Sequence, residues 1–264
     1  MLTVVKNQIK VVLLSIKYAL MRKMLNKNAF ITNIVFMILN NATFIIQMLV
    51  MYSIKDNVGG YSFKEMLLLW GMAAGTFGFS RFTFRNAFHL SETINSGKLD
   101  AFLVQPKNVL VSSITTGVEV SAIGDIIYSY IMLFVYGFSI KNFILFTFFL
   151  ITGALIITSI SVILSSLSFW FNKSDVIADV GNQLMINFAT YPDGIFKGLA
   201  KILLFTLIPV GIANYIPVHV IKEFNIYLFL IVIFTTFLLV TLAFIVFNKG
   251  LKKYSSSNLM IARI

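Results

Sequence analysis

The stretch IYLFLIVIFTTFLLVTLAFIVF, residues 226–247, has no charged side chain in 22 consecutive positions. About 20 apolar residues form a helix long enough to cross the hydrocarbon core of a bilayer. Comparable stretches recur at about 30–52, 63–84, 109–136 and 143–171. The chain is 58% hydrophobic and only 12% charged, about half the charged fraction of a soluble domain. The sequence therefore predicts an all-α integral membrane protein.

A sixth span is predicted at 175–191, DVIADVGNQLMINFATY, which is long enough but carries a polar stripe. On a helical wheel Asp175, Asp179, Gln183 and Asn187 share one side. In a membrane such a side faces protein or water rather than lipid. The alternative interpretation is an amphipathic helix on the cytoplasmic surface.

Residues 1–28 are typical of an interfacial helix rather than a span. Lys6, Lys10 and Lys17 fall within about 40° of one another on a wheel, with apolar residues around the rest. Such a helix lies among the lipid headgroups with its lysines toward water.

Residues 192–217 are apolar but interrupted by prolines. Tyr191 and Pro192 begin this segment, and Pro209 and Pro217 divide its second half. Broken helices are tolerated at membrane depth where the backbone is buried in protein or lines a cavity. We expect an outer re-entrant helix pair here, followed by the last span and a cytoplasmic tail at 248–264.

The distribution of basic residues predicts the orientation. With six spans and both termini inside, fifteen of the 21 Lys and Arg residues lie inside, as the positive-inside rule requires. The net charge of +11 is concentrated beside apolar stretches, which indicates anionic lipid headgroups rather than a nucleic-acid partner.

Catalytic motifs are missing from the sequence. It has no P-loop, no GxSxG or HExxH motif and no cysteine, and its two histidines, His89 and His219, lie on opposite sides in the predicted topology. We therefore expect no catalytic residue, no metal site and no enzyme activity in this chain.

Polar residues inside the predicted spans are candidates for a translocation path. A carboxylate in hydrocarbon costs at least about 2.5 kcal/mol, so Glu119 and Asp179 must face protein or water. Gln183 and Asn187 extend the stripe of Asp179. For Glu119 a helix-packing hydrogen bond is an equal alternative, and packing is also the favoured interpretation of Asp125.

Two further patterns predict packing between spans. Asn40, Asn41 and Gln47 favour hydrogen bonds between helices. Gly71 and Gly75, in GMAAG, predict a close helix contact in the second span.

The polar segment at 85–108 joins the second and third spans on the inner side. Gly97 ends a short helix in its middle, HLSETINS. This helix is either an ordinary connector or the part of the chain that a partner pushes.

Four stretches resemble a branch of the type-2 ABC export permeases. They are INSGKLDAFLVQP at 94–106, FATYPDGIF at 188–196, IPVGIANYIP at 208–217 and GLKKYSSS at 250–257, in the expected order. The resemblance implies a permease subunit with six spans, an N-terminal elbow helix, an outer re-entrant pair and a cytoplasmic coupling helix.

The resemblance also implies partners. Two separate ATP-binding cassette subunits would carry ATP and Mg, leaving this chain without a cofactor, and a second permease copy or paralogue would complete a dimer in a bacterial plasma membrane. The coupling residues would be Glu92, Ile94, Gly97, Leu99 and Asp100. The function expected is ATP-driven export. The alternatives are a secondary transporter driven by an ion gradient and a non-transporting accessory membrane protein.

Overall fold

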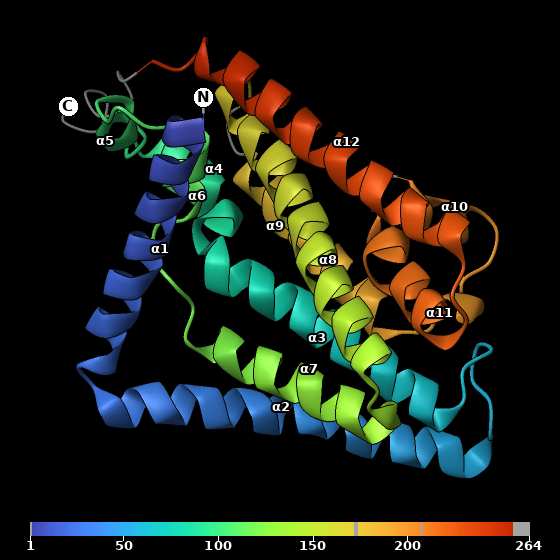
Figure 1. Ribbon diagram of the computed structural model, residues 1–264. Helices are drawn as coiled ribbons and strands as arrows, with labels where there is room; N and C mark the ends of the chain where they lie inside the picture. The colour runs from blue at the N-terminus through green and yellow to red at the C-terminus, as the bar shows by residue number, and fades with distance from the viewer. Residues whose placement is uncertain (1, 172–173, 207, 256–264) are drawn as a thin grey trace.

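The computed structural model describes residues 2–171, 174–206 and 208–255 of the chain (Figure 1). Its regular elements are helices, as the sequence predicts, apart from an isolated bridge between Val58 and Tyr61. In order they are α1 (Leu2–Met24), α2 (Lys27–Ile54), α3 (Phe63–Thr83), η1 (Arg85–His89), α4 (Leu90–Asn95), α5 (Asp100–Leu103), α6 (Val109–Ile114), α7 (Ser121–Gly137), α8 (Ile140–Ser166), η2 (Leu167–Phe169), α9 (Asp175–Thr190), η3 (Asp193–Ile195), α10 (Leu199–Phe205), η4 (Gly211–Tyr215), α11 (Ile216–Lys222) and α12 (Ile226–Leu251).

Three helices are long and apolar enough to cross a membrane unaided: α2, α8 with its extension η2, and α12. The chain is therefore a multi-pass membrane protein. α3 contains Lys64, Glu65 and Arg81 near its ends, and α9 has 16 residues, about 24 Å at 1.5 Å per residue. The six-span topology stays a prediction.

The centre of the bundle is the contact between α3 and α7. Gly71, Gly75 and Gly78 face α7, and an added Cβ would lie 2.7 Å from Met132 Cβ, 2.7 Å from Ser129 Oγ and 2.6 Å from Asp125 Cβ, respectively. The close contact predicted from the GMAAG pattern is confirmed. Because α3 also packs against α8 and α9, 13 of its 21 residues are buried.

The third predicted span, 109–136, is not one helix, and the prediction is corrected here. The chain forms α6, turns at residues 115–120 and continues as α7. Gly117 adopts φ +86°, a conformation that L side chains rarely adopt. The hydroxyls of Thr115 and Thr116 donate to the carbonyls of Val111 and Ser112, which gives the end of α6 local hydrogen-bond partners.

One end of the bundle, called here the connector end, holds residues 85–108, α1 and the last turn of α12 (Figure 1). α1 crosses this end at a steep angle to α2, and Lys6, Lys10 and Lys17 are exposed along it. Its Gln8 accepts a hydrogen bond from the Asn108 backbone at 3.2 Å, and Ser15 Oγ donates to the Thr115 carbonyl at 3.1 Å. These features agree with the predicted interfacial helix.

The opposite end, called here the loop end, holds the α2–α3 loop and residues 191–225 (Figure 1). The predicted broken segment is divided into η3, α10, η4 and α11, each of seven residues or fewer. Pro192 precedes η3, Pro209 precedes η4, and Pro217 lies in the first turn of α11, where a missing N–H costs nothing. Of the predicted tail at 248–264, residues 256–264 lie outside the described residues.

We predict that Gly75→Leu lowers the free energy of unfolding by about 1–3 kcal/mol, because the new side chain collides with Ser129 and Leu150. The melting temperature in detergent measures this effect. Thr241→Leu, which adds bulk to an exposed position on α12, is the control and should leave melting unchanged. Equal melting of the two variants would contradict the close α3–α7 contact.

Candidate functional site

The predicted coupling residues lie in and beside α4 at the connector end, but most of them are buried. Gly97 adopts φ +73° and ends the helix, as the sequence predicts. Ile94 and Leu99 are 2% and 0% exposed and belong to an apolar cluster that also contains Phe247 of α12. These residues anchor the connector to the bundle, and only Glu92, paired with Lys98 at 2.8 Å, is exposed among the five.

The surface that projects from the connector end is the tip formed by α5 and the following turn. Val104 is 85% exposed and Leu103 is 42% exposed. Sequence reasoning missed both residues, although they lie inside the stretch DAFLVQP. These two side chains form a small exposed apolar surface outside the apolar spans.

Asp100 links the connector to the C-terminal segment. Its carboxyl lies beside Tyr254, and burial together with this neighbouring charge raises the pKa of Tyr254 to about 12. The ring of Tyr254 also packs edge-on against Phe169, with 6.1 Å between centroids. Gly250 is required nearby, because a Cβ there would collide with the Phe169 ring. The INSGKLDAFLVQP stretch and residues 250–254 are therefore parts of one packed unit.

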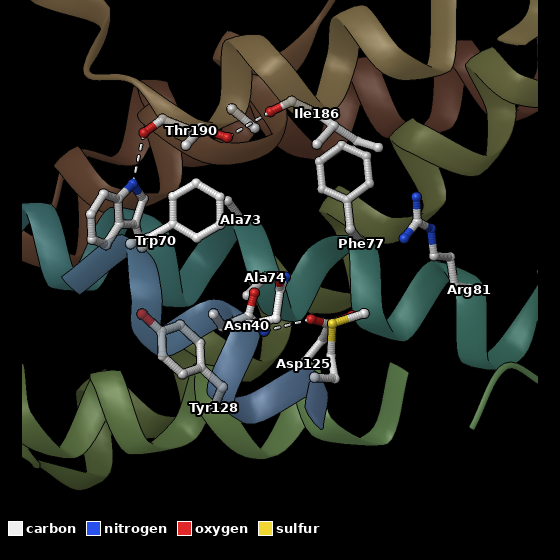
Figure 2. A pocket seen from close by; sticks show the side chains of 14 residues that line it. Asn40, Trp70, Ala73, Ala74, Phe77, Arg81, Asp125, Tyr128, Ile186 and Thr190 are labelled. Atoms are coloured by element: carbon white, nitrogen blue, oxygen red, sulfur yellow. Dashed lines mark hydrogen bonds between the residues drawn. The ribbon is translucent and has the colours of Figure 1, made fainter. Parts of the chain in front are cut away.

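A half-open cavity of about 210 Å³ lies between α2, α3, α7 and α9 (Figure 2). α3 and α7 form its floor, while α2 and α9 form its walls. The residues that the argument below uses are Asn40, Asn41, Trp70, Arg81, Asp125 and Thr190.

Two polar contacts cross the cavity. Asn41 donates to Asp125 Oδ1 at 2.7 Å, joining α2 to α7. This bond confirms the packing interpretation of both residues. Trp70 donates its indole N–H to the Thr190 carbonyl at 2.7 Å, joining α3 to the last turn of α9. These two hydrogen bonds therefore connect the four helices that surround the cavity in two pairs.

The polar stripe of α9 lies beside this cavity. Asp179, Gln183 and Asn187 are exposed, and Gln183 donates to Asn187 at 3.1 Å. The opposite side of α9 is packed, and its Asn182 accepts a hydrogen bond from Ser161 at 2.6 Å. Ile186 and Thr190, which line the cavity, fall within about 60° of Asp179 and Gln183 on the helical wheel.

Glu119 is not part of this surface. It lies in the turn between α6 and α7, half-buried, and accepts a hydrogen bond from Ser121 at 3.2 Å. Its expected position within a continuous span at 109–136 is wrong, because the turn at Gly117 interrupts that helix.

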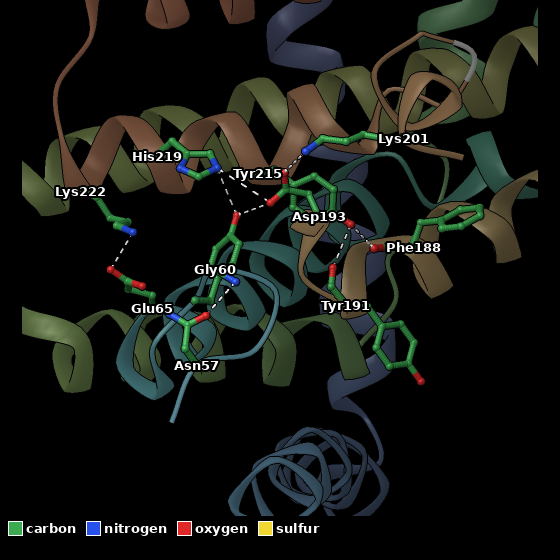
Figure 3. Close-up of polar contacts among 11 residues, drawn as sticks. Asn57, Gly60, Glu65, Phe188, Tyr191, Asp193, Lys201, Tyr215, His219 and Lys222 are labelled. Atoms are coloured by element: carbon green, nitrogen blue, oxygen red, sulfur yellow. Dashed lines mark hydrogen bonds and ion pairs between the residues drawn. The ribbon is translucent and has the colours of Figure 1, made fainter. Parts of the chain in front are cut away.

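At the loop end, the sequence analysis missed a cluster of ionisable side chains around Asp193 (Figure 3). Tyr61 donates to Asp193 Oδ1 at 2.9 Å, and Lys201 lies 3.4 Å from Asp193 Oδ2. His219 Nε2 is 3.3 Å from the Tyr61 hydroxyl and 3.9 Å from Asp193. These residues come from the α2–α3 loop, η3, α10 and α11, so the cluster ties the broken segment to the loop.

Close packing of the backbone accompanies this cluster. A Cβ at Gly194 would collide with the Gly59 carbonyl. The Tyr215 hydroxyl donates to the carbonyls of Phe188 and Tyr191, which belong to the end of α9 and the residue after it. Of the predicted turn residues, Pro192 is therefore held in place, whereas Tyr191 is 43% exposed.

The pKa of Asp193 reflects its partners. Burial alone would raise the pKa of its carboxyl, but the neighbouring His219, the hydrogen bond from Tyr61 and the charge of Lys201 hold it below its ordinary value of 3.8. Because the folded pKa is lower than the unfolded one, the carboxylate stabilises the fold above the unfolded value. That stabilisation is lost as the pH falls through the folded value.

We predict that Asp193→Asn lowers the free energy of unfolding at pH 7 by roughly 1–3 kcal/mol, because Lys201 loses its charged partner. The variant should also lose less stability than the parent protein when the pH is lowered from 5 to below about 3.8. Melting temperatures across this range test both effects. Asp56→Asn, in the same loop and exposed, is the control, and a pH profile identical in all three proteins would contradict the role of Asp193.

Within the described ranges, no group of three or more His, Asp or Glu side chains is placed to hold a metal ion. The chain presents a lateral cavity, a polar helix face and a connector at one end of a bundle of apolar helices. These features are typical of a membrane-embedded transport subunit.

The family model described as ABC-2 family transporter protein matches residues 8–258. The chain belongs to this family and is an ABC-2 type permease, the membrane component of an ABC transporter. Membership implies association with an ATP-binding cassette component. No curated protein and no solved structure is significantly similar to it.

Proposed function

We propose that this permease forms half of the translocation path of an ATP-driven exporter. Two copies, or one copy and a paralogue, face each other across the polar stripe of α9, and the apolar, exposed helix α2 lies at the lipid-facing edge of this interface. Two ATP-binding cassette subunits bind the connector end, which is cytoplasmic, in a bacterial plasma membrane. Substrate enters from the cytoplasm or the inner leaflet and leaves at the loop end.

The observation that carries this proposal is the exposed polar stripe of α9. Asp179, Gln183 and Asn187 point away from the rest of the chain. Lipid tails offer them no hydrogen bonds, so a carboxylate and two amides at this position require water or another protein surface. A water-filled path lined by two facing subunits supplies both.

The connector supports a specific route for force. The buried side chains of Ile94 and Leu99 lie in one apolar cluster with Val162 of α8 and Phe247 of α12. A push on the exposed tip at Leu103 and Val104 therefore acts on a rigid unit that includes the ends of two spans. In this proposal the tip contacts the ATPase, while Ile94, Gly97 and Leu99 transmit the movement.

A single-cysteine scan tests the path directly, because the chain has no native cysteine. We predict that Asp179→Cys and Gln183→Cys react with a charged, membrane-impermeant methanethiosulfonate in vesicles at least about tenfold faster than Phe237→Cys. Only a hydrated thiol ionises readily to the reactive thiolate, and Phe237 is 73% exposed on the apolar surface of α12. Equal, slow labelling at all three positions would place α9 against lipid and overturn the path.

Val104→Asp should reduce recovery of an ATP-binding cassette subunit, purified with the chain in mild detergent, by at least about tenfold, because it places a charge in an apolar contact. Ile54→Asp is a matched control, since Ile54 is 83% exposed at the end of α2 opposite the connector. Loss of the cassette in both variants would indicate general disruption. Retention in both would remove the tip from the interface.

A further inference from the structure

The cavity between α2, α3, α7 and α9 is polar at one end and apolar at the other. Toward the connector end lie Arg81, in the last turn of α3, and Asp125 with its partner Asn41. Toward the loop end lies Trp70, packed edge-on against Phe44 with 5.8 Å between ring centroids. Trp70 and Arg81 are eleven positions apart on one helix, about 16 Å.

Arg81 forms no ion pair with the other described residues. Its guanidinium lies over the Phe88 ring at 5.7 Å, and its acidic neighbour in the cavity, Asp125, accepts from Asn41. The Tyr128 hydroxyl, from another lining residue, is buried and has no hydrogen-bond partner among the described residues. A buried hydroxyl without a partner is costly, but this hydroxyl points toward Trp70 (Figure 2) and is therefore not a contact of a group bound at Arg81.

The volume limits what can occupy this space. About 210 Å³ is smaller than the roughly 300–1,000 Å³ of pockets that enclose a whole drug-sized ligand. The cavity is half open, so a larger occupant extends out through the gap between α2 and α9. A molecule with a small charged head and a flexible apolar chain fits these constraints, because the chain can leave into lipid while the head stays inside.

We propose that the cavity binds the head and upper chain of a phosphate-bearing, single- or double-chain amphiphile from the leaflet at the connector end. Its anionic head lies at Arg81 and its chain runs along Ala73 and Ala74 toward Trp70. This inference rests on the proposed export function, since it names the class of substrate that the path receives. Arg81 attracts the anionic head, and the apolar half of the cavity beside Trp70 selects for an apolar chain on the same molecule.

Trp70 provides a direct probe, because the chain has only one other tryptophan, Trp170. A Trp170→Phe background leaves a single indole that lines the cavity. Bromine atoms on an acyl chain quench indole fluorescence on contact. The full chain is reconstituted into vesicles that contain increasing fractions of dibrominated phosphatidic acid or of dibrominated phosphatidylcholine with the same chains.

We expect half-maximal quenching at an about tenfold lower mole fraction of phosphatidic acid than of phosphatidylcholine, the factor that one charge-assisted hydrogen bond supplies. Arg81→Gln should abolish this preference. Asp125→Asn should increase it, because it removes the nearest negative charge in the cavity. If Arg81 and Asp125 had only structural roles, both substitutions would change the preference for phosphatidic acid in the same direction.

Arg85→Gln is the matched control. It removes the same charge just beyond the end of α3, where the guanidinium lies beside Gly117 rather than in the cavity. Its quenching curve should match that of the parent protein. Loss of the preference in Arg85→Gln as well would assign it to general attraction by the basic surface and would overturn the site.

Equal quenching by the two lipids in the parent protein would identify ordinary surrounding lipid and overturn the proposal. No quenching by either lipid would mean that the cavity is closed to chains, with the same consequence. Relief of quenching by millimolar glycerol 3-phosphate would assign the site to soluble phosphates instead. None of these quenching results depends on an ATPase. A negative result would therefore overturn the lipid site without bearing on the proposed export function, which is tested by recovery of an ATP-binding cassette subunit.

Discussion

The close contact between α3 and α7 is the constraint on which the arrangement of this permease depends. Three glycines on α3 bring the two backbones together, and the side chains of Asp125, Ser129 and Met132 fill the space that a Cβ would occupy. Because of this contact α3 is buried on nearly every side, with α8 and α9 on its other faces. The paired helices α3 and α7 form the floor of the cavity, and α2 and α9 form its walls.

The two ends of the bundle are held together by different chemistry. At the connector end an apolar cluster around Leu90, Leu99 and Phe247 joins the connector to α8 and α12. Such a cluster opposes separation of the connector from α8 and α12, but the hydrophobic effect that stabilises it is not directional. At the loop end Tyr61, Asp193 and their partners form short polar contacts between four segments. These contacts can be exchanged for water one at a time, which suits the end at which, in the proposed function, the substrate leaves.

Sequence patterns were sufficient for features that depend on neighbouring residues. The apolar stretches locate α2, α8 and α12, the GMAAG pattern identifies the face of α3 that meets α7, and the wheel of α9 separates its packed from its exposed side. The prolines of 192–217 likewise indicate the breaks between short helices, while the interfacial position of residues 1–28 and the re-entrant path of 192–217 stay predictions.

Features that depend on partners distant in sequence were not predictable. The turn at Gly117 was missed for another reason: it depends on the local backbone conformation, which the apolar composition of 109–136 does not indicate. Ile94 and Leu99 looked like docking residues, but Phe247, about 150 positions later, buries them. The Asp193 cluster combines residues from positions 61 to 219, and a single sequence contains no signal that brings Tyr61 and His219 together.

The attachment of α1 has a consequence for how the chain is assembled during synthesis. Gln8 and Ser15 bind backbone and side-chain groups at Asn108, Ser112 and Thr115, about one hundred residues later. Those partners are synthesised only after α2 and α3. Until then α1 has only the lipid surface and the start of α2 to hold it. Its lysines therefore act first as a temporary attachment to anionic headgroups, and the hydrogen bonds to α6 replace that attachment once the first half of the bundle has closed.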